Sequence, residues 1–167
     1  VPRTRHHPAR TEPTEVGALL RAIDAYTGSY VTIAALRLAA LTLLRSSEIR
    51  LAVWDEISDD IWVVPAERIK VGAAAHTVPL SRQAQAIISD LRAKNGDDRF
   101  VLPGRHSRPL SENGPNTALA AMGYKGLHTI HGFRTTAVTL LGELGFPRNV
   151  VDLQLDHKEE NQVRAAY

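Results

Sequence analysis

Six side chains that could act together on a phosphate group are spread along the sequence. They are two arginines, a lysine, two histidines and a tyrosine, namely Arg45, Lys70, His131, Arg134, His157 and Tyr167. An arginine guanidinium stays charged at any working pH and can hold two phosphate oxygens at once. Histidine and lysine can donate hydrogen bonds or move protons, and a tyrosine hydroxyl becomes a nucleophile when it loses its proton. Together, these residue types could bind a phosphodiester and attack its phosphorus.

Each of these residues, taken alone, has an ordinary structural explanation. Arg45 could be a cation that faces the dipole at a helix end, and Lys70 could be a solvated loop lysine. His131 and Arg134 are spaced to lie on one face of a helix, which alone indicates only a neighbouring pair. Tyr167 is the last residue of the sequence, and terminal residues are usually frayed. Only the joint pattern indicates a function.

The segments around these residues resemble the catalytic motifs of the tyrosine recombinases, and in particular of the prophage integrases. The segments are LLRSSEIR, AERIKVG, IHGFRTTA, LQLDHKEEN and VRAAY. Prophage integrases carry stretches similar to HHPA, RIKxxxxHxVPLS, HGFRTTA and VRAAY. The resemblance covers nearly the whole chain, and it is specific because the order, the spacing and the flanking residues agree. The chain departs from the family after Arg45, where Ser-Ser stands in place of Pro-Gly or a similar pair.

The resemblance implies a site-specific DNA recombinase, an integrase that cleaves and rejoins DNA through a 3′-phosphotyrosine during prophage or genomic-island integration and excision. Tyr167 would be the nucleophile, while Arg45 and Arg134 would stabilise the charge on the non-bridging phosphate oxygens. His131 and His157 would donate hydrogen bonds to these oxygens or move protons. His131 is the expected base, because a tyrosine with an ordinary pKa of about 10 is mostly protonated at neutral pH. Lys70 would protonate the leaving 5′-oxygen.

We expect no metal and no other cofactor. The two arginines would neutralise charge as a metal ion does in other phosphoryl-transfer enzymes. The sequence has no GxxxxGK[ST] motif and no carboxylate cluster suited to two magnesium ions. His128 and His131 have the spacing of a metal-binding pair, but no third ligand stands at a suggestive position. The absence of Cys excludes disulfide bonds and cysteine-based metal sites.

The elements that must position these residues are mostly helices. Helical spacing of apolar residues predicts a helix that begins near Pro13 and ends near Gly28, and a largely buried helix from about Val31 to Leu44. Ser46 or Ser47 would cap a short helix whose first turn holds Glu48, a structural partner for one of the arginines. Ser81 would cap a further helix, and the pattern is helical again from Thr117 onward.

One stretch has the alternating pattern of a sheet instead. It predicts three short strands, Val53–Ile57, Ile61–Val64 and Thr77–Leu80, with Asp59-Asp60 in the first turn and Lys70 in the second. His76 precedes the third strand and is interpreted as structural. We therefore predict a mostly α (α+β) fold, a helical catalytic domain of tyrosine-recombinase type with a small three-stranded antiparallel sheet.

The first residues differ in composition from the rest. Residues 1–12 hold three arginines, two histidines and two prolines, so we interpret them as a basic linker or lead-in. His6 and His7 would make phosphate contacts at most. Residues 13–167 would be the catalytic domain, truncated at the nucleophile. Integrases usually carry DNA-binding regions before this domain and a tail after the nucleophile that contacts a neighbouring protomer. Without them, we expect weak and largely nonspecific DNA binding.

The composition permits a DNA partner without requiring one. Lys and Arg number 20 against 18 Asp and Glu, which gives a net charge of +2. No apolar run approaches the roughly 20 residues that span a bilayer. VPRTRHHPAR has no apolar signal core, so we expect a cytoplasmic, nucleoid-associated bacterial protein with no membrane partner. The resemblance implies double-stranded DNA attachment sites and, for the full-length protein, a homotetramer on DNA. A host bending factor and an excisionase are candidate accessory partners.

Two other functions stay open at this point. One is relaxation of DNA without strand exchange, as in type IB topoisomerases, which share this chemistry. The other is a non-catalytic DNA-binding fragment. A helical interaction domain with a coincidental motif is a further class, against which the full set of six residues argues.

Overall fold

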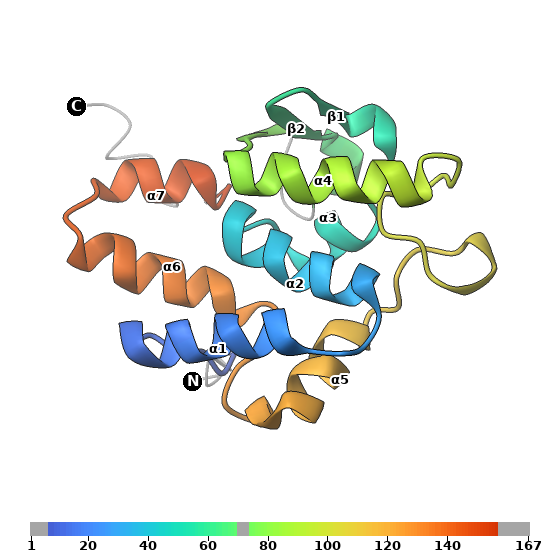
Figure 1. The fold of residues 1–167 in the computed structure, drawn as a ribbon. Coiled ribbons are helices and arrows are strands. Elements are labelled where there is room, and N and C mark those ends of the chain that lie inside the picture. Colours follow the sequence, from blue (N-terminus) through green and yellow to red (C-terminus); the bar gives the residue numbers. More distant parts are fainter. Residues whose placement is uncertain (1–6, 70–73, 157–167) are drawn as a thin grey trace, which may run out of the picture.

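The computed structural model of the chain describes residues 7–69 and 74–156 (Figure 1). Lys70, His157 and Tyr167 lie outside the described residues. Within the two described ranges the chain is mostly helical and has one small antiparallel sheet, so the predicted fold class is confirmed. No described helix is long and apolar enough to cross a membrane.

The helices account for most of the described chain. The α-helices are α1 (Pro13–Ala25), α2 (Tyr30–Thr42), α3 (Ser46–Arg50), α4 (Arg82–Asn95), α5 (Gly114–Leu119), α6 (Gly132–Glu143) and α7 (Arg148–Gln154). Short 3-10 turns lie at Trp54–Glu56, Ala66–Arg68 and Arg105–Ser107, and a π-type turn spans Ala120–Tyr124. Helix α4 begins as predicted, because the Ser81 side chain accepts a hydrogen bond from the backbone N–H of Ala84.

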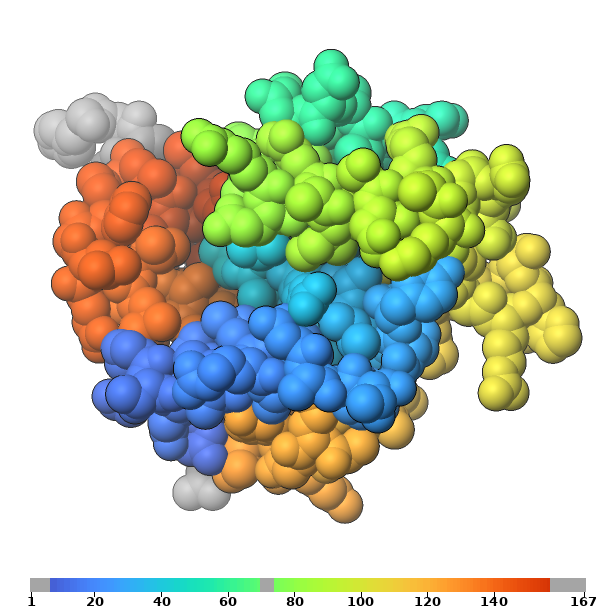
Figure 2. All heavy atoms as spheres, in the orientation of Figure 1, coloured from blue at the N-terminus to red at the C-terminus, as the bar shows by residue number. Residues whose placement is uncertain are grey.

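Helix α2 is the centre of the fold. It packs against α1, α3, α4, α5 and α6, and Figures 1 and 2 show α4 and α1 covering it on either side. Residues on several faces of α2 are buried, as its apolar composition predicts: Val31, Ala34, Ala35, Leu36, Leu38 and Ala39. The helix ends at Leu43, whose backbone is left-handed with φ 59°. This turn sends the chain directly into α3.

The sheet has the order β1-β2-β3, and both pairs are antiparallel. Its strands are β1 (Ile57–Ser58), β2 (Ile61–Val64) and β3 (His76–Pro79). The prediction for β2 is confirmed, and β3 begins one residue earlier than predicted. Side chains alternate along the strands, and Trp62, Val64 and Val78 reach the core with no exposed surface.

The predicted first strand, Val53–Ile57, is wrong over most of its length. Val53 instead forms an isolated bridge with Phe100, and Trp54–Glu56 is a 3-10 turn. The buried Glu56 carboxylate accepts hydrogen bonds from Trp62 Nε1 and from Arg68. These contacts need Glu56 to point inward, and they override the alternating sequence pattern.

A smaller apolar cluster lies apart from the main core. It joins Leu43 at the end of α2 to Val151 and Leu155, with partly buried residues of α6 packed against it. This cluster holds α7 against α6 and against the end of α2. It therefore brings residues 155 and 156 next to the start of α3, where Arg45 lies.

Candidate active site

Arg45 is held at the N-terminus of α3 by a buried carboxylate. Glu48, whose side chain is 1% exposed, accepts hydrogen bonds from the backbone N–H of Arg45 at 2.7 Å and from its Nη1 at 2.8 Å. Arg45 itself is the N-cap residue, so the prediction that Ser46 or Ser47 caps this helix is wrong. Glu48, at the third position of the helix, accepts from the backbone N–H of the N-cap residue, which is one half of a capping box. The prediction that Glu48 is a structural partner of an arginine is confirmed.

The Arg45 guanidinium also reaches the end of α7. Its Nη1 lies 3.2 Å from Oδ2 of Asp156, and its Nη2 donates to the main-chain oxygen of Asp156 at 3.4 Å. Asp156 has a left-handed backbone, with φ 50°. Burial opposes the charge of Arg45, but the hydrogen bonds and negative charges of Glu48 and Asp156 outweigh it and raise the pKa of Arg45. Arg45 is therefore a fixed cation.

Arg134 enters the same junction from α6. It is 6% exposed, and its guanidinium donates to the main-chain oxygens of Leu43 and of Leu155, the second at 2.6 Å. Burial and the neighbouring charge of Arg45 lower the pKa of Arg134 to about 10, against the opposing effect of the two carboxylates. The group stays charged at neutral pH.

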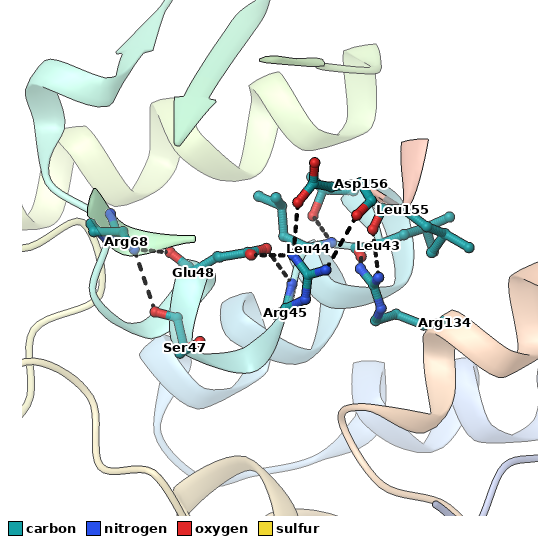
Figure 3. Close-up of polar contacts among 10 residues, drawn as sticks. Leu43, Leu44, Arg45, Ser47, Glu48, Arg68, Arg134, Leu155 and Asp156 are labelled. Carbon is teal, nitrogen blue, oxygen red and sulfur yellow. Dashed lines mark hydrogen bonds and ion pairs between the residues drawn. The ribbon is translucent and has the colours of Figure 1, made fainter. Parts of the chain in front are cut away.

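The two arginines thus meet, although they come from distant parts of the sequence. Figure 3 shows the Arg45 guanidinium bonded to Glu48 and Asp156, and the Arg134 guanidinium bonded to the main chain at Leu43 and Leu155. Two guanidiniums from separate helices, fixed side by side, are suited to hold the oxygens of one phosphate group. In the described structure, Glu48 and Asp156 balance their two positive charges.

His131 lies one turn before Arg134, at the N-cap position of α6. The residue is half-buried, and its ring packs against the ring of His7 with centroids 4.4 Å apart and planes tilted by 50°. His131 therefore stands at the end of α6 that also carries Arg134.

Lys70, His157 and Tyr167 are the other predicted residues, and they lie outside the described ranges. Lys70 and His157 each follow directly after a described residue. Ile69, which precedes Lys70, is buried. Asp156, which precedes His157, contacts Arg45. Tyr167 has no described neighbour in the sequence. The assignments of Lys70, His157 and Tyr167 stay predictions.

Three residues near the site were missed as contributors by the sequence analysis. Arg68, two residues before Lys70, pairs with Glu56 and donates to the main-chain oxygen of Glu48 at 2.5 Å. Asp156 pairs with Arg45. His76 is buried in β3, and burial lowers its pKa while the nearby carboxylates Asp156 and Glu48 oppose that change. Both Arg68 and His76 lie in the segment RIKVGAAAHTVPLS, whose similarity to the family motif was the available signal.

The described residues do not form a cluster of metal ligands. Within residues 7–69 and 74–156, no group of three His, Cys, Asp or Glu side chains could hold a metal ion. His128 is almost fully buried and accepts a hydrogen bond at Nδ1 from the backbone N–H of Arg10. Its ring contacts Phe133 edge-on. His128 therefore serves packing and hydrogen bonding.

Comparison with known proteins gives the class of this chain. The Phage integrase family model matches residues 9–167, so the chain belongs to the phage integrase family. It is 39% identical to the integrase of Enterobacteria phage P4 over 99% of this chain and 42% of that protein. It is 38% identical to the putative protein IntB of Escherichia coli (strain K12) over 98% of this chain and 46% of that protein. The chain thus spans less than half the length of these relatives.

The fold is also found in a solved structure. A lambda integrase tetramer bound to a Holliday junction superposes with a TM-score of 0.70 and 19% identity, over 96% of this chain and 50% of that chain. At this identity, the likeness concerns the fold alone. It agrees with the helical architecture and small sheet described above.

Proposed function

We propose that this chain is the catalytic domain of a site-specific tyrosine recombinase, a prophage-type integrase. The observation that carries the proposal is the convergence of Arg45 and Arg134, which α3 and α6 bring to one junction. Membership of the phage integrase family supports it and favours recombination over topoisomerase-like relaxation or a non-catalytic fragment. Residues 13–167 form the catalytic domain in this proposal, and residues 1–12 lead into it.

The arginine pair acts on the scissile phosphate. Its guanidiniums hold the two non-bridging oxygens and stabilise the negative charge that grows on them in the transition state. The contacts of the two arginines support this role, because Glu48 holds Arg45 and the main-chain oxygens of Leu43 and Leu155 hold Arg134. His157 adds a hydrogen bond to the same oxygens.

The proposed reaction moves one proton on each side of the phosphorus. His131 takes the proton of the Tyr167 hydroxyl as its oxygen attacks phosphorus. The bond from phosphorus to the 5′-oxygen breaks, and Lys70 gives that oxygen a proton. The products are a 3′-phosphotyrosine and a free 5′-hydroxyl. Attack of a 5′-hydroxyl from another strand reverses these steps and rejoins the DNA.

The partners belong to the proposal as well. The main partner is double-stranded DNA that carries attachment sites, on which the full-length protein forms a homotetramer. A host bending factor and an excisionase are the accessory partners. The likeness to a lambda integrase tetramer bound to a Holliday junction supports DNA and self-assembly. Because the proposed substrate is chromosomal DNA, we place the full-length protein at the bacterial nucleoid.

A nicked suicide substrate tests the proposal. The full-length protein that contains this sequence is incubated with DNA nicked next to the cleavage point, so that a short fragment is lost and religation fails. A recombinase should accumulate covalently on this DNA, and with two intact sites it should exchange their strands. Covalent capture without exchange, together with relaxation of supercoils, would indicate a topoisomerase. Binding without capture would leave only a DNA-binding fragment.

A further inference from the structure

The described part of the lead-in, residues 7–12, is bonded to the helix that carries His131 and Arg134. It forms no helix or strand, yet its backbone is anchored on both sides of the start of α6. The oxygen of Pro8 accepts from the N–H of Thr129 at 3.2 Å and from its Oγ1 at 3.5 Å. The N–H of Arg10 donates to Nδ1 of His128 at 3.0 Å, and its oxygen accepts from Oγ1 of Thr136 at 2.5 Å.

The lead-in also approaches α6 closely at Gly132. A Cβ atom on Gly132 would lie 2.5 Å from the oxygen of Pro8 and 3.3 Å from the Cα of Ala9. Because both are backbone atoms, neither could move aside on its own. Gly132 follows His131 directly, so the lead-in backbone packs against the first residue of the helix that the candidate base caps.

The His7 ring lies against His131, next to this anchored backbone. His7 is exposed and precedes the anchored Pro8. Its ring covers the half-buried ring of His131, with centroids 4.4 Å apart. An exposed imidazole in contact with the candidate base has two available roles. It could restrain the His131 ring, or it could contact a DNA phosphate itself.

We propose that His7 is a positioning residue for His131. Its ring holds the His131 imidazole in one orientation at the start of α6 and covers one face of it. The inference rests on the proposed function, in which His131 is the base that takes the proton of Tyr167. It gives two residues of the HHPA motif a purpose: Pro8 anchors the lead-in backbone, together with Arg10 that follows the motif, and His7 supports the base.

The test compares a variant that removes the ring with one that keeps it. In the full-length protein, His7→Ala should lower the rate of covalent capture on the suicide substrate about 2- to 10-fold, the range expected for loss of one ring contact. His7→Phe keeps a flat ring and should recover most of that loss. The dissociation constant for DNA should stay within about 2-fold for both variants, because the role is one of orientation. His106→Ala, at an exposed histidine of the Arg105–Ser107 turn, is the matched control.

A spectroscopic signal reports on the contact itself. The ring protons of His131 in an NMR spectrum should shift in His7→Ala, because the neighbouring ring current is lost, and should stay unmoved in His106→Ala. If His7→Phe is as slow as His7→Ala and both bind DNA more weakly, His7 contacts phosphate and the proposal is wrong. Unchanged capture and unchanged His131 signals in His7→Ala would also overturn it. Absence of capture in the wild-type protein would instead refute the proposed function.

Discussion

The residues of the site form a nearly neutral cluster around two fixed cations. Arg45 pairs with Glu48 and Asp156, while Arg134 is held by main-chain oxygens. A phosphate that enters this cluster meets two guanidiniums but also the carboxylate of Asp156. Asp156 lies beside Arg45 at the end of a short helix, and its side chain is 18% exposed. In the proposed function, the carboxylate would therefore compete with a DNA phosphate for Arg45.

Removal of that competing charge should strengthen DNA binding. Asp156→Asn keeps a residue that tolerates the left-handed backbone, and it leaves Arg45 with Glu48 alone. We expect the dissociation constant of the full-length protein for DNA to fall about 3- to 10-fold at moderate salt, measured by fluorescence anisotropy. Asp90→Asn, which removes an exposed carboxylate of α4 from a pair with Lys94, should change it less than about 2-fold. An equal gain in both variants would indicate a general charge effect.

The buried His128 should make stability depend on pH. Burial, with a smaller effect from Arg10, lowers its pKa from 6.5 to about 4. As the pH falls, His128 therefore takes up a proton near pH 6.5 in the unfolded chain but only near pH 4 in the folded chain. The free energy of unfolding should be highest above pH 6.5 and should fall between pH 6.5 and 4. The contribution of His128 to this fall is at most about 3 kcal/mol.

Urea unfolding at several pH values measures that slope. His128→Asn keeps an acceptor for the N–H of Arg10 without a group that titrates in this window. It should be less stable than the wild type at pH 7 and should show a shallower decline toward pH 4. If His128→Asn shows the same dependence of the unfolding free energy on pH as the wild type, other groups cause that dependence.

At the scale of elements, the end of α2, the start of α3, the start of α6 and the end of α7 meet at the site. Each contributes a terminus, where backbone groups lack helical partners and bind side chains instead. The main-chain oxygens of Leu43 and Leu155 receive Arg134 in this way. The lead-in adds a further contact to α6 at Gly132, which makes the packing of that helix specific.

Two glycines of α6 give a matched test of this packing. Gly132→Ala places a methyl group 2.5 Å from the oxygen of Pro8, so the lead-in or the helix must shift. We expect a loss of about 1–3 kcal/mol in the free energy of unfolding. A methyl group at Gly142 would meet nothing within 4 Å, so Gly142→Ala should be neutral or stabilise the helix by up to about 1 kcal/mol. Urea denaturation measures both, and equal effects would contradict tight packing at Gly132.

The sequence predicts those elements that follow local rules. The apolar pattern of α2, the Ser81 cap of α4 and strand β2 are confirmed because neighbouring residues decide them. The first strand and the cap of α3 are wrong because side-chain contacts decide them. Glu56 turns inward to Trp62 and Arg68, and Arg45 takes the N-cap position, where its backbone N–H donates to Glu48.

At the scale of the whole molecule, the fold brings together residues that the sequence holds far apart. The resemblance to the recombinases selected Arg45 and Arg134 for a shared role, and the structure places both at one junction. The resemblance could not reveal Asp156 as a partner of Arg45, because that contact depends on a left-handed turn after α7. The small apolar cluster of Leu43, Val151 and Leu155 makes the junction possible.

The central claim is that Tyr167 attacks DNA, and mapping the residue that carries the DNA tests it most directly. The full-length protein is captured on the nicked substrate, the complex is digested with trypsin and nuclease, and the modified peptide is sequenced by mass spectrometry. We expect a phosphonucleotide on Tyr167. We also expect that Tyr167→Phe, which keeps the ring, forms no covalent complex while binding DNA as the wild type does. A modification on any other residue, or undiminished capture by Tyr167→Phe, would contradict the account.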